Sequence, residues 1–396
     1  MAARGWKEVC GEYDWDIFWA DVHSLTTDSG FDHARLQEHQ RLNHFPRHVE
    51  LTRKDLLVKN LKRARKALER EGRGHEYDFF PQTFVLPSEY NLFAEEFRRT
   101  PGLTWIMKPC GRAQGRGIFL IDRMSQVAAW RKEREGRGAA TAAAGGGRPA
   151  AGAVAGAAAA LEAFVVSRYL GRPLLLGGRK FDLRIYALVV SFQPLRAYLH
   201  RGGFCRLSSG RYTAERASMH DLPMHLTNCA IQRRAADGGA DASAAAIKWP
   251  VRSLRISLSA ALGDEAADRL FGEIQAIVRR TLLAVHRVIT QDRHCFELYG
   301  YDVLVDQDLK PWLIEVNASP SLASDTPADR KLKFDMVDDA LDLVDLEGRR
   351  RGGQPPATWG GFDLIWDHKG AVEPHPCLES LLGCSFSSRA RKAAPV

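Results

Sequence analysis

The residues best suited to chemistry are three oxygen-bearing side chains, Asp302, Glu315 and Asn317. They lie in the stretch YDVLVDQDLKPWLIEVN (301–317), where two apolar, β-rich runs flank a polar turn and so predict a β-hairpin. An all-oxygen set without His or Cys suits Mg²⁺, which is usually held by one or two carboxylates together with substrate phosphates. The alternative is that both carboxylates are solvated strand residues. An unpaired charge is costly to bury between apolar strands, so the sequence favours a metal site.

Strand geometry decides which of these side chains share a face. Successive side chains point to opposite faces of a sheet, so Glu315 and Asn317 are expected on one face. Asp302 joins them if the register of the hairpin allows it. The opposite face is expected to carry Trp312, Ile314 and Val316.

A lysine followed by a glycine-rich loop forms a second candidate site, in WIMKPCGRAQGRGIFLI (105–121). Glycines let backbone N–H groups approach phosphate oxygens, and a lysine adds a point charge. No helix follows the glycines, so this is neither a Walker A nor a Rossmann fingerprint, and a tight hairpin turn also explains it. The candidate residues are Lys108, which ends a predicted strand, and Gln114, Gly115, Arg116 and Gly117 in the turn.

Charges alternate along a third stretch, RKFDLRIYALV (179–189). Strand alternation places Lys180, Asp182 and Arg184 on one face and apolar residues on the other. The pattern is typical of a nucleotide site, and a ladder of cross-strand ion pairs is the alternative. The later HLTN (225–228) adds a hydroxyl and an amide that could reach a phosphate or a metal.

A basic helix is predicted to begin near Thr52. Its apolar residues repeat with helical spacing, and its other side carries Arg53, Lys54, Lys59, Lys62, Arg63, Arg65 and Lys66. A solvated helix face explains such a run of basic residues, and so does a surface that binds an acidic polymer. The formal net charge of +8 over 396 residues also points to an acidic partner: nucleic acid, an anionic membrane or an acidic protein tail.

Composition indicates the cellular compartment and the fold class of the protein. The cysteines are scattered without a CxxC pair, which argues for a reducing compartment and against a zinc site or a disulfide framework. No apolar run could cross a bilayer, and the start of the chain has no signal-peptide core, so we expect a soluble intracellular protein. Two Ala/Gly-rich stretches, 136–160 and 235–246, are expected to be disordered insertions. The remainder predicts a mixed α+β fold with largely antiparallel sheets, including a strand–turn–strand in 6–19 and one more strand in GGFDLIWD (360–367).

In combination these stretches resemble the ATP-grasp fold, which clamps ATP between two mainly antiparallel sheets. More narrowly, the lysine–glycine stretch, GGRKFDLRIYALV, HLTN and CFELYGYDVLVDQDLKPWLIEVNASPSL are similar to the tubulin tyrosine ligase-like family. The stretches FELYGYDVLVDQDLKPWL and GGFDLIWD favour its branch of ciliary tubulin polyglutamylases. The resemblance covers roughly residues 4–347, apart from the two insertions.

This resemblance implies an ATP- and Mg²⁺-dependent ligase that adds free L-glutamate to glutamate side chains of acidic tubulin tails through an acyl phosphate. It also implies roles for individual residues. ATP would contact Lys108, Gln114, Gly115, Arg116, Gly117, Ser167, Arg168, Tyr169, Leu170, Lys180, Asp182, Thr227 and Asn228. The transferring phosphoryl group would meet Arg184, and Mg²⁺ would be held by Asp302, Glu315 and Asn317. The incoming amino acid would meet Arg206, Lys248 and Lys333.

The resemblance divides the chain into four expected parts. These are an N-terminal domain with the basic helix (1–79), a central ATP-grasp domain (80–180), a catalytic domain (181–347) and a mostly irregular tail (348–396). Against the family pattern, the chain is expected to start later and to miss the opening strand of this domain, either because the gene model is truncated or because the domain is smaller. A glycine ligase and an inactive microtubule-binding relative are the alternatives. We expect a cytoplasmic, cytoskeletal protein of cilia or flagella, with tubulin as partner, no nucleic acid and no membrane insertion; the need for accessory subunits stays open.

Overall fold

The computed structural model describes residues 2–10, 14–25, 36–112, 115–133, 162–228, 231–232, 248–348, 356–373 and 375–385. Both Ala/Gly-rich insertions lie outside these residues, and so does Gln114. Within the described part, no helix is long and apolar enough to cross a membrane.

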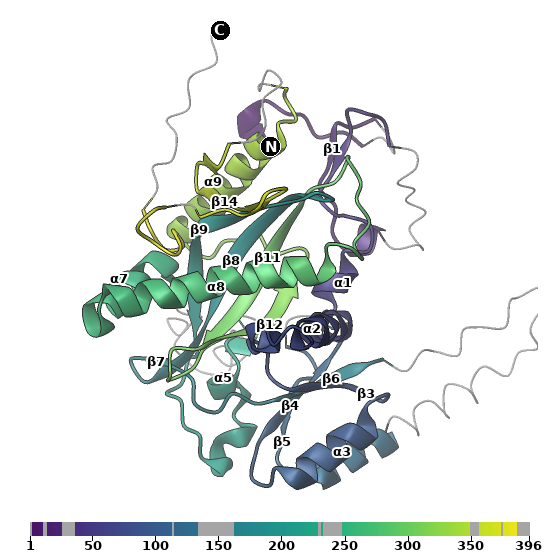
Figure 1. The fold of residues 1–396 in the computed structure, drawn as a ribbon, viewed down its shortest axis with the longest axis vertical. Helices are drawn as coiled ribbons and strands as arrows, with labels where there is room; N and C mark the ends of the chain where they lie inside the picture. Colours follow the sequence, from purple (N-terminus) through teal and green to yellow (C-terminus); the bar gives the residue numbers. More distant parts are fainter. Residues whose placement is uncertain are drawn as a thin grey trace, which may run out of the picture.

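A nine-stranded antiparallel sheet forms the centre of the molecule, and its main path has the order β12-β11-β8-β9-β14-β13 (Figure 1). Its longest strands are β8 (Arg179–Phe192) and β9 (Leu195–Leu207), followed by the predicted hairpin of β11 (Glu297–Val305) and β12 (Pro311–Asn317). The short strands are β7 (Leu175–Leu176), β10 (Lys248–Pro250), β13 (Thr358–Trp359), β14 (Phe362–Asp367) and β15 (Gly370–Ala371).

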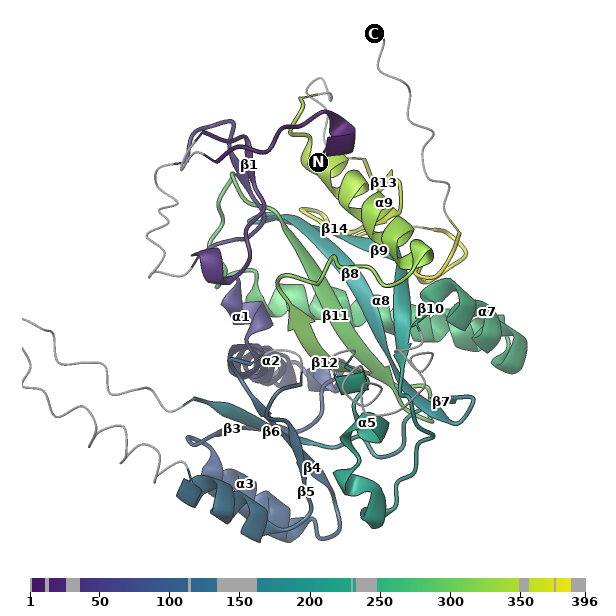
Figure 2. The ribbon, with the colours of Figure 1, turned by 180° about the vertical axis from the view of Figure 1, so that it is seen from behind.

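Helices cover both faces of this sheet, as the two opposite views show (Figures 1 and 2). On one face lies α8 (Asp264–Val285), whose apolar residues recur with helical spacing and are buried, with α7 (Val251–Leu262) beside it. On the other lies α9 (Pro327–Val344). The alternation predicted for β8 is confirmed, because Leu183 and Ile185 enter the core under α8 while Tyr186 and Leu188 enter the core under α9.

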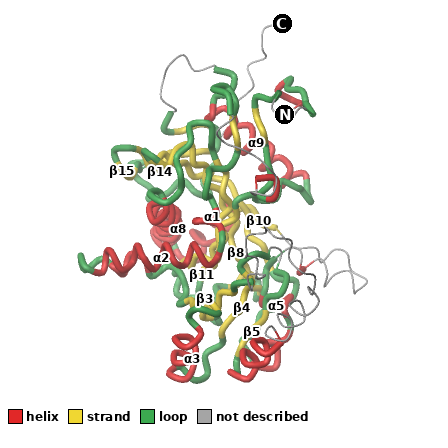
Figure 3. Tube along the Cα trace, turned by 90° about the vertical axis from the view of Figure 1, so that its right-hand side faces the viewer, coloured by secondary structure: helices red, strands yellow, loops and turns green. Residues whose placement is uncertain are grey.

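A smaller antiparallel sheet has the order β3-β6-β4-β5. Its strands are β3 (Thr83–Leu86), β4 (Trp105–Pro109), β5 (Phe119–Ile121) and β6 (Phe164–Arg168). The helix α3 (Tyr90–Arg99) packs on it through Phe93, whose ring meets Trp105 edge-on. The basic helix α2 (Lys54–Glu69), preceded by α1 (Val49–Thr52), lies between the two sheets (Figures 1 and 3).

The N-terminal segment differs from the prediction. Among the described residues of 6–19, only β1 (Ile17–Phe18) is a strand, and it pairs in parallel with β2 (Arg41–Leu42). Side chains, rather than a ladder, hold the start of the chain: Arg4 makes ion pairs with Asp338, Asp342 and Glu347 of the α9 region. Phe18 lies in β1, whereas Trp6 and Trp19 are loop residues that pack against the core under α9.

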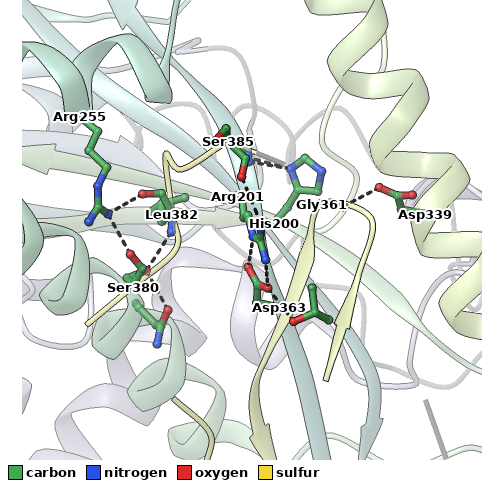
Figure 4. A network of polar contacts seen from close by, with 12 residues as sticks. His200, Arg201, Arg255, Asp339, Gly361, Asp363, Ser380, Leu382 and Ser385 are labelled. Atoms are coloured by element: carbon green, nitrogen blue, oxygen red, sulfur yellow. Dashed lines mark hydrogen bonds and ion pairs between the residues drawn. The ribbon is translucent and has the colours of Figure 1, made fainter. Parts of the chain in front are cut away.

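The C-terminal region continues the large sheet. The stretch GGFDLIWD docks as predicted, because β14 pairs with β9. Arg201 of β9 pairs with Asp363 of β14 at 2.6 and 2.7 Å (Figure 4). Further along, Arg255 of α7 donates to the carbonyl oxygens of Ser380 (2.9 Å) and Leu382 (2.8 Å). These contacts fix residues 380–385 against the sheet.

Candidate active site

A cavity lies between the two sheets and beside α2, lined by residues of both sheets. It brings together most of the residues for which the sequence suggests a nucleotide site. These are Lys108, Gly115, Ser167, Arg168, Tyr169, Leu170, Lys180, Asp182, Thr227, Asn228, Asp302 and Glu315. Arg116, Gly117, Arg184, Arg206, Asn317, Lys248 and Lys333 are not among its lining residues.

The hairpin places its two carboxylates opposite each other, because Asp302 and Glu315 are register partners. The register shifts between Asp302 and Val303, so one extra residue is inserted on β12. As a result Val316 enters the core under α8, whereas Ile314 lines the cavity. The expectation that Ile314 and Val316 share a face is wrong, because strict alternation does not survive a bulge.

Ion pairs connect the charges of the cavity wall across three strands. Asp302 accepts from Arg184 Nε at 2.5 Å and pairs with Arg206 Nη2 at 2.7 Å. Arg206 Nε also donates to Asp182 at 2.8 Å. Burial by itself would raise the pKa of Asp302, but the two guanidinium groups outweigh it and hold this pKa well below its usual range. The alternating charges of β8 thus form a cross-strand ladder, and Asp182 and Asp302 of this ladder line the cavity.

Two lysines face the cavity from different sheets, Lys108 on β4 and Lys180 on β8. Burial lowers the pKa of Lys180 to about 7; the charge of Lys108 lowers it further and Asp182 opposes the change. Burial also lowers the pKa of Lys108, against the opposing effect of Glu315. Lys180 is buried and Lys108 is partly buried, and two neighbouring ammonium groups provide a site for an anion such as a polyphosphate.

The segment 167–170 at the end of β6, which we call the hinge, contributes a hydrogen-bond chain that includes His225, a residue for which no role was predicted. Lys180 Nζ donates to the Tyr169 hydroxyl at 2.9 Å, and its ammonium lies 4.4 Å from the centre of the same ring. The Tyr169 hydroxyl in turn lies 2.9 Å from His225 Nδ1. His225 opens the stretch HLTN, so its position beside Thr227 and Asn228 was the available signal.

The glycine-rich turn has the backbone that its residues suggest. Gly115 and Gly117 have φ values of +72° and +74°, a region that side chains disfavour. A Cβ on Gly115 would also lie 2.5 Å from the Ile231 side chain. Arg116 between them is exposed. The turn therefore presents backbone rather than side chains near the cavity.

The donor set expected for a metal ion consists of oxygen atoms only and fits Mg²⁺ in its chemistry. Glu315 lies on the cavity wall with Lys54 Nζ 3.3 Å from its Oε2 atom. Asn317 is two residues further along β12, and its Nδ2 donates to the Gly300 carbonyl at 3.2 Å, which leaves the amide oxygen for another partner.

The residues expected for the amino-acid substrate form a cluster of their own beyond Arg206. Lys248 of β10 is the register partner of Arg206 and pairs with Asp325 and Asp329, both at 2.7 Å. Lys333 also pairs with Asp329, at 3.1 Å. Arg206 itself is buried between two carboxylates, so the structure assigns it to the ion-pair ladder as well.

The seven cations predicted for one basic surface are separated by the structure. Lys54 lines the cavity, and its pairing with Glu315 removes it from any outer surface. Lys62 pairs with Glu89 at 2.9 Å, and Arg65 pairs with Glu69 and Asp78, both at 3.1 Å, while Arg53 pairs with Asp55. The exposed row consists of Lys59, Arg63 and Lys66, continued by Arg70, which the prediction omitted. We call these four residues the basic row of α2.

A buried histidine, also missed by the sequence, ties the ends of the hairpin to the N-terminal segment. His44 Nδ1 lies 2.8 Å from Glu297 Oε1 at the start of β11, and His44 Nε2 lies 3.1 Å from Ser319 Oγ just after β12. Glu297 also accepts from the Phe45 backbone N–H and the Tyr299 hydroxyl. His44, His48 and Glu297 bring ligand atoms within 4.8 Å of one another. The carboxylate is satisfied by hydrogen bonds, so this geometry needs no metal ion.

The sequence matches the profile of the Tubulin-tyrosine ligase family over residues 33–351. The chain belongs to this family. It is similar to the probable tubulin polyglutamylase TTLL9 of Bos taurus, with 45% identity over 379 residues, 92% of this chain and 80% of the relative. The probable alpha-tubulin polyglutamylase Ttll1 of Tetrahymena thermophila is 44% identical over 366 residues, 87% of this chain and 82% of the relative. Tubulin polyglutamylase TTLL5 of Homo sapiens is 32% identical over 87% of this chain but only 25% of the relative. The motifs FELYGYDVLVDQDLKPWL and GGFDLIWD favour the same branch, and its ninth member in particular.

Proposed function

We propose that this protein is an ATP-dependent tubulin polyglutamylase, which joins free L-glutamate to glutamate side chains in the acidic C-terminal tails of tubulin. The observation that carries the proposal is one cavity whose lining includes two lysines with lowered pKa values, the ion-paired Asp302 and the carboxylate of Glu315. The similarity to relatives named tubulin polyglutamylases supports the choice of substrate. It also favours glutamate over glycine as the added amino acid.

The reaction proceeds in two steps that balance without an oxidant or a reductant. A carboxylate oxygen of the tubulin tail attacks the γ-phosphorus of ATP, and ADP leaves. The amine nitrogen of free glutamate then attacks the acyl carbon, inorganic phosphate leaves and the amine loses a proton. Both steps need positioned cations rather than a nucleophile from the protein, because charge develops on phosphoryl oxygens.

The residues in and next to the cavity each have a task in this proposal. Lys108 and the backbone of the glycine turn bind phosphate oxygens, and the hinge 167–170 binds the adenine ring beside Lys180. Arg184, held in place by Asp302, neutralises the transferring phosphoryl group. Asp302, Glu315 and Asn317 would hold Mg²⁺, which when bound supplies charge neutralisation of the phosphates. ATP is thus clamped between the two sheets.

The assignment of Glu315 predicts a specific loss. Glu315→Gln keeps the size of the side chain and should leave the fold intact, but a neutral amide holds a metal ion poorly, so ligation should fall by about 100-fold or more. The measurement is incorporation of labelled glutamate into microtubules with ATP, with labelled glycine as the parallel arm. Glu95→Gln on the exposed side of α3 is the matched control. Near-normal turnover by a folded Glu315→Gln protein would remove the metal assignment.

We further propose that the protein acts on axonemal or basal-body microtubules of cilia or flagella. The names of the relatives identify tubulin as their substrate, and the basic row of α2 supports an acidic polymer as partner. A fluorescent fusion in ciliated cells, with loss of glutamylated tubulin on its removal, tests this placement.

A further inference from the structure

A second cavity lies beyond the ion-pair ladder, between β9, β10, the start of α9 and the C-terminal segment. Its apolar lining includes Phe204, Trp249 and Leu332, and Trp249 is 39% exposed although it is a large aromatic residue. Its charged lining consists of Arg201, Arg252, Asp329 and Lys248, the last of which was expected to meet the incoming amino acid. An exposed aromatic residue beside charges is typical of a surface that binds a peptide.

The C-terminal segment forms one wall of this cavity, with Cys384 and Ser385 in the lining. The wall is held firmly, as Figure 4 shows. The Gly383 backbone N–H donates to the Arg201 carbonyl at 2.8 Å, and Arg201 Nη1 donates to the Ser385 carbonyl at 3.3 Å. Together with the Arg255 contacts to Ser380 and Leu382, these bonds place the wall at a fixed position relative to β9.

The cavity has two polar groups that no other described residue satisfies. The Arg252 side chain is exposed and makes no ion pair or hydrogen bond with another described residue. Asp329 Oδ1 is buried and has no hydrogen-bond partner among the described residues. An unpaired guanidinium group suits a carboxylate, and a buried unpaired acceptor suits an N–H group brought by a ligand. A peptide with acidic side chains supplies both groups.

The position of the cavity favours a polymer rather than a free amino acid as its ligand. Asp182, Arg206 and Lys248 are register partners across β8, β9 and β10. Strands are about 4.8 Å apart, so Lys248 lies about 10 Å from the strand that carries Arg184. About three extended residues span this distance, whereas a single glutamate at the reacting phosphate does not reach beyond Lys248.

We propose that this second cavity binds a glutamate-rich stretch of the acceptor peptide next to the glutamate that is modified. The proposal rests on the proposed function for the identity of the peptide. The C-terminal segment is then part of the substrate site, and Arg252 pairs with a peptide carboxylate while Asp329 accepts a peptide N–H.

The test is direct binding of a fluorescent glutamate-rich peptide, followed by anisotropy with the full-length protein. Cys384→Phe fills the cavity and should weaken binding about tenfold or more by steric exclusion. Cys377→Phe places the same ring at an exposed cysteine outside the cavity and is the matched control. Arg252→Gln, a surface change that keeps the protein folded, should weaken binding about two- to fivefold. Binding of a non-hydrolysable ATP analogue should be the same in all four proteins.

The outcomes separate the two proposals. Equal peptide binding by the wild type, Cys384→Phe and Arg252→Gln would overturn the cavity assignment even if ligation is normal. Displacement of the peptide from the wild type by millimolar free glutamate would also overturn it, because the cavity would then be an amino-acid site. Loss of peptide binding in Cys384→Phe and not in Cys377→Phe would support it, even in a protein that fails to ligate glutamate, in which case the proposed function alone would fall.

Discussion

The ammonium group of Lys180 occupies an unusual environment for a lysine. It lies over the Tyr169 ring, bonded to its hydroxyl, and it is buried next to the charge of Lys108. Its pKa of about 7 means that it is partly neutral in the free protein near neutral pH. A bound polyphosphate favours the protonated form and raises this pKa, so nucleotide binding and protonation are linked.

Proton uptake is the measurable consequence. Free protein binds fewer protons than the complex between about pH 7 and 9, so ATP affinity should rise as the pH falls through this range. It should level off below about pH 6, where Lys180 is already protonated. Calorimetry in two buffers of different ionisation enthalpy should show uptake approaching about one proton per ATP at pH 8. Lys180→Met should remove most of this uptake; the same uptake in both proteins would contradict the assignment.

At the level of single residues, the sequence predicts well on which face of a strand a side chain lies, but it predicts poorly which residue that side chain contacts. Alternation along β8 was enough to place Asp182 and Arg184 on one face of the strand, because a regular strand has a fixed period, and Asp182 lines the cavity. The face of Ile314 was not predictable, because the bulge depends on pairing with β11. The position of Lys54 could not be read either, since its charge resembles that of its neighbours and only the packing of α2 against β12 makes it the partner of Glu315.

Among the elements, the hairpin β11–β12 is tied at its open end by His44. Its imidazole contacts Glu297, which precedes Asp302 on β11, and Ser319, which follows Glu315 and Asn317 of β12; these three are the candidate metal ligands. Gly300 leaves room for this arrangement, since a Cβ there would lie 2.9 Å from the Pro320 side chain. The loop that follows Asn317 is thereby held against β11, which positions Asn317 and Glu315 together.

Removing this tie should loosen the candidate metal ligands without unfolding the protein. Ser319 is exposed, so Ser319→Ala costs one hydrogen bond, worth about 1 kcal/mol. We expect the Mg²⁺ concentration for half-maximal ATP turnover to rise about two- to tenfold, with little change in the melting temperature. Ser321→Ala, two residues further along the same loop, should behave as the wild type. An unchanged Mg²⁺ dependence in Ser319→Ala would show that the tie is purely structural.

The elements that the sequence missed are those that depend on distant contacts. The hairpin, α8 and β14 were predictable because each has a strong local pattern. The prediction for segment 6–19 was wrong at Trp6 and Trp19, which lie in loops packed against the core under α9, and Arg4 anchors the start of the chain by ion pairs. Such ion pairs join residues more than 300 positions apart, which no local pattern encodes.

For the whole molecule, the position of α2 between the two sheets connects catalysis with the outer surface. Its first turn reaches into the cavity through Lys54, while its basic row faces the solvent. Lys59, Arg63, Lys66 and Arg70 are spaced by three or four residues and therefore lie along one side of the helix. A tubulin tail bound along this row would be held by the same helix that contacts the candidate metal site.

Neutralising the basic row should separate microtubule binding from nucleotide binding. The triple variant Lys59→Gln, Arg63→Gln, Lys66→Gln should bind microtubules severalfold more weakly, because each exposed charge contributes attraction to an acidic polymer. Its ATP affinity should stay close to that of the wild type, since none of the three lines the cavity. The triple variant Arg98→Gln, Arg99→Gln, Arg123→Gln removes the same charge from exposed positions on the small-sheet side and is the control.

Co-sedimentation with microtubules over a salt series is the measurement. Exposed charges are screened within about 8 Å at physiological salt, so wild-type binding should fall steeply as salt rises and the basic-row variant should show a shallower slope. If both variants bind alike at every salt concentration, α2 serves only to join the two sheets, and the recruiting surface lies elsewhere.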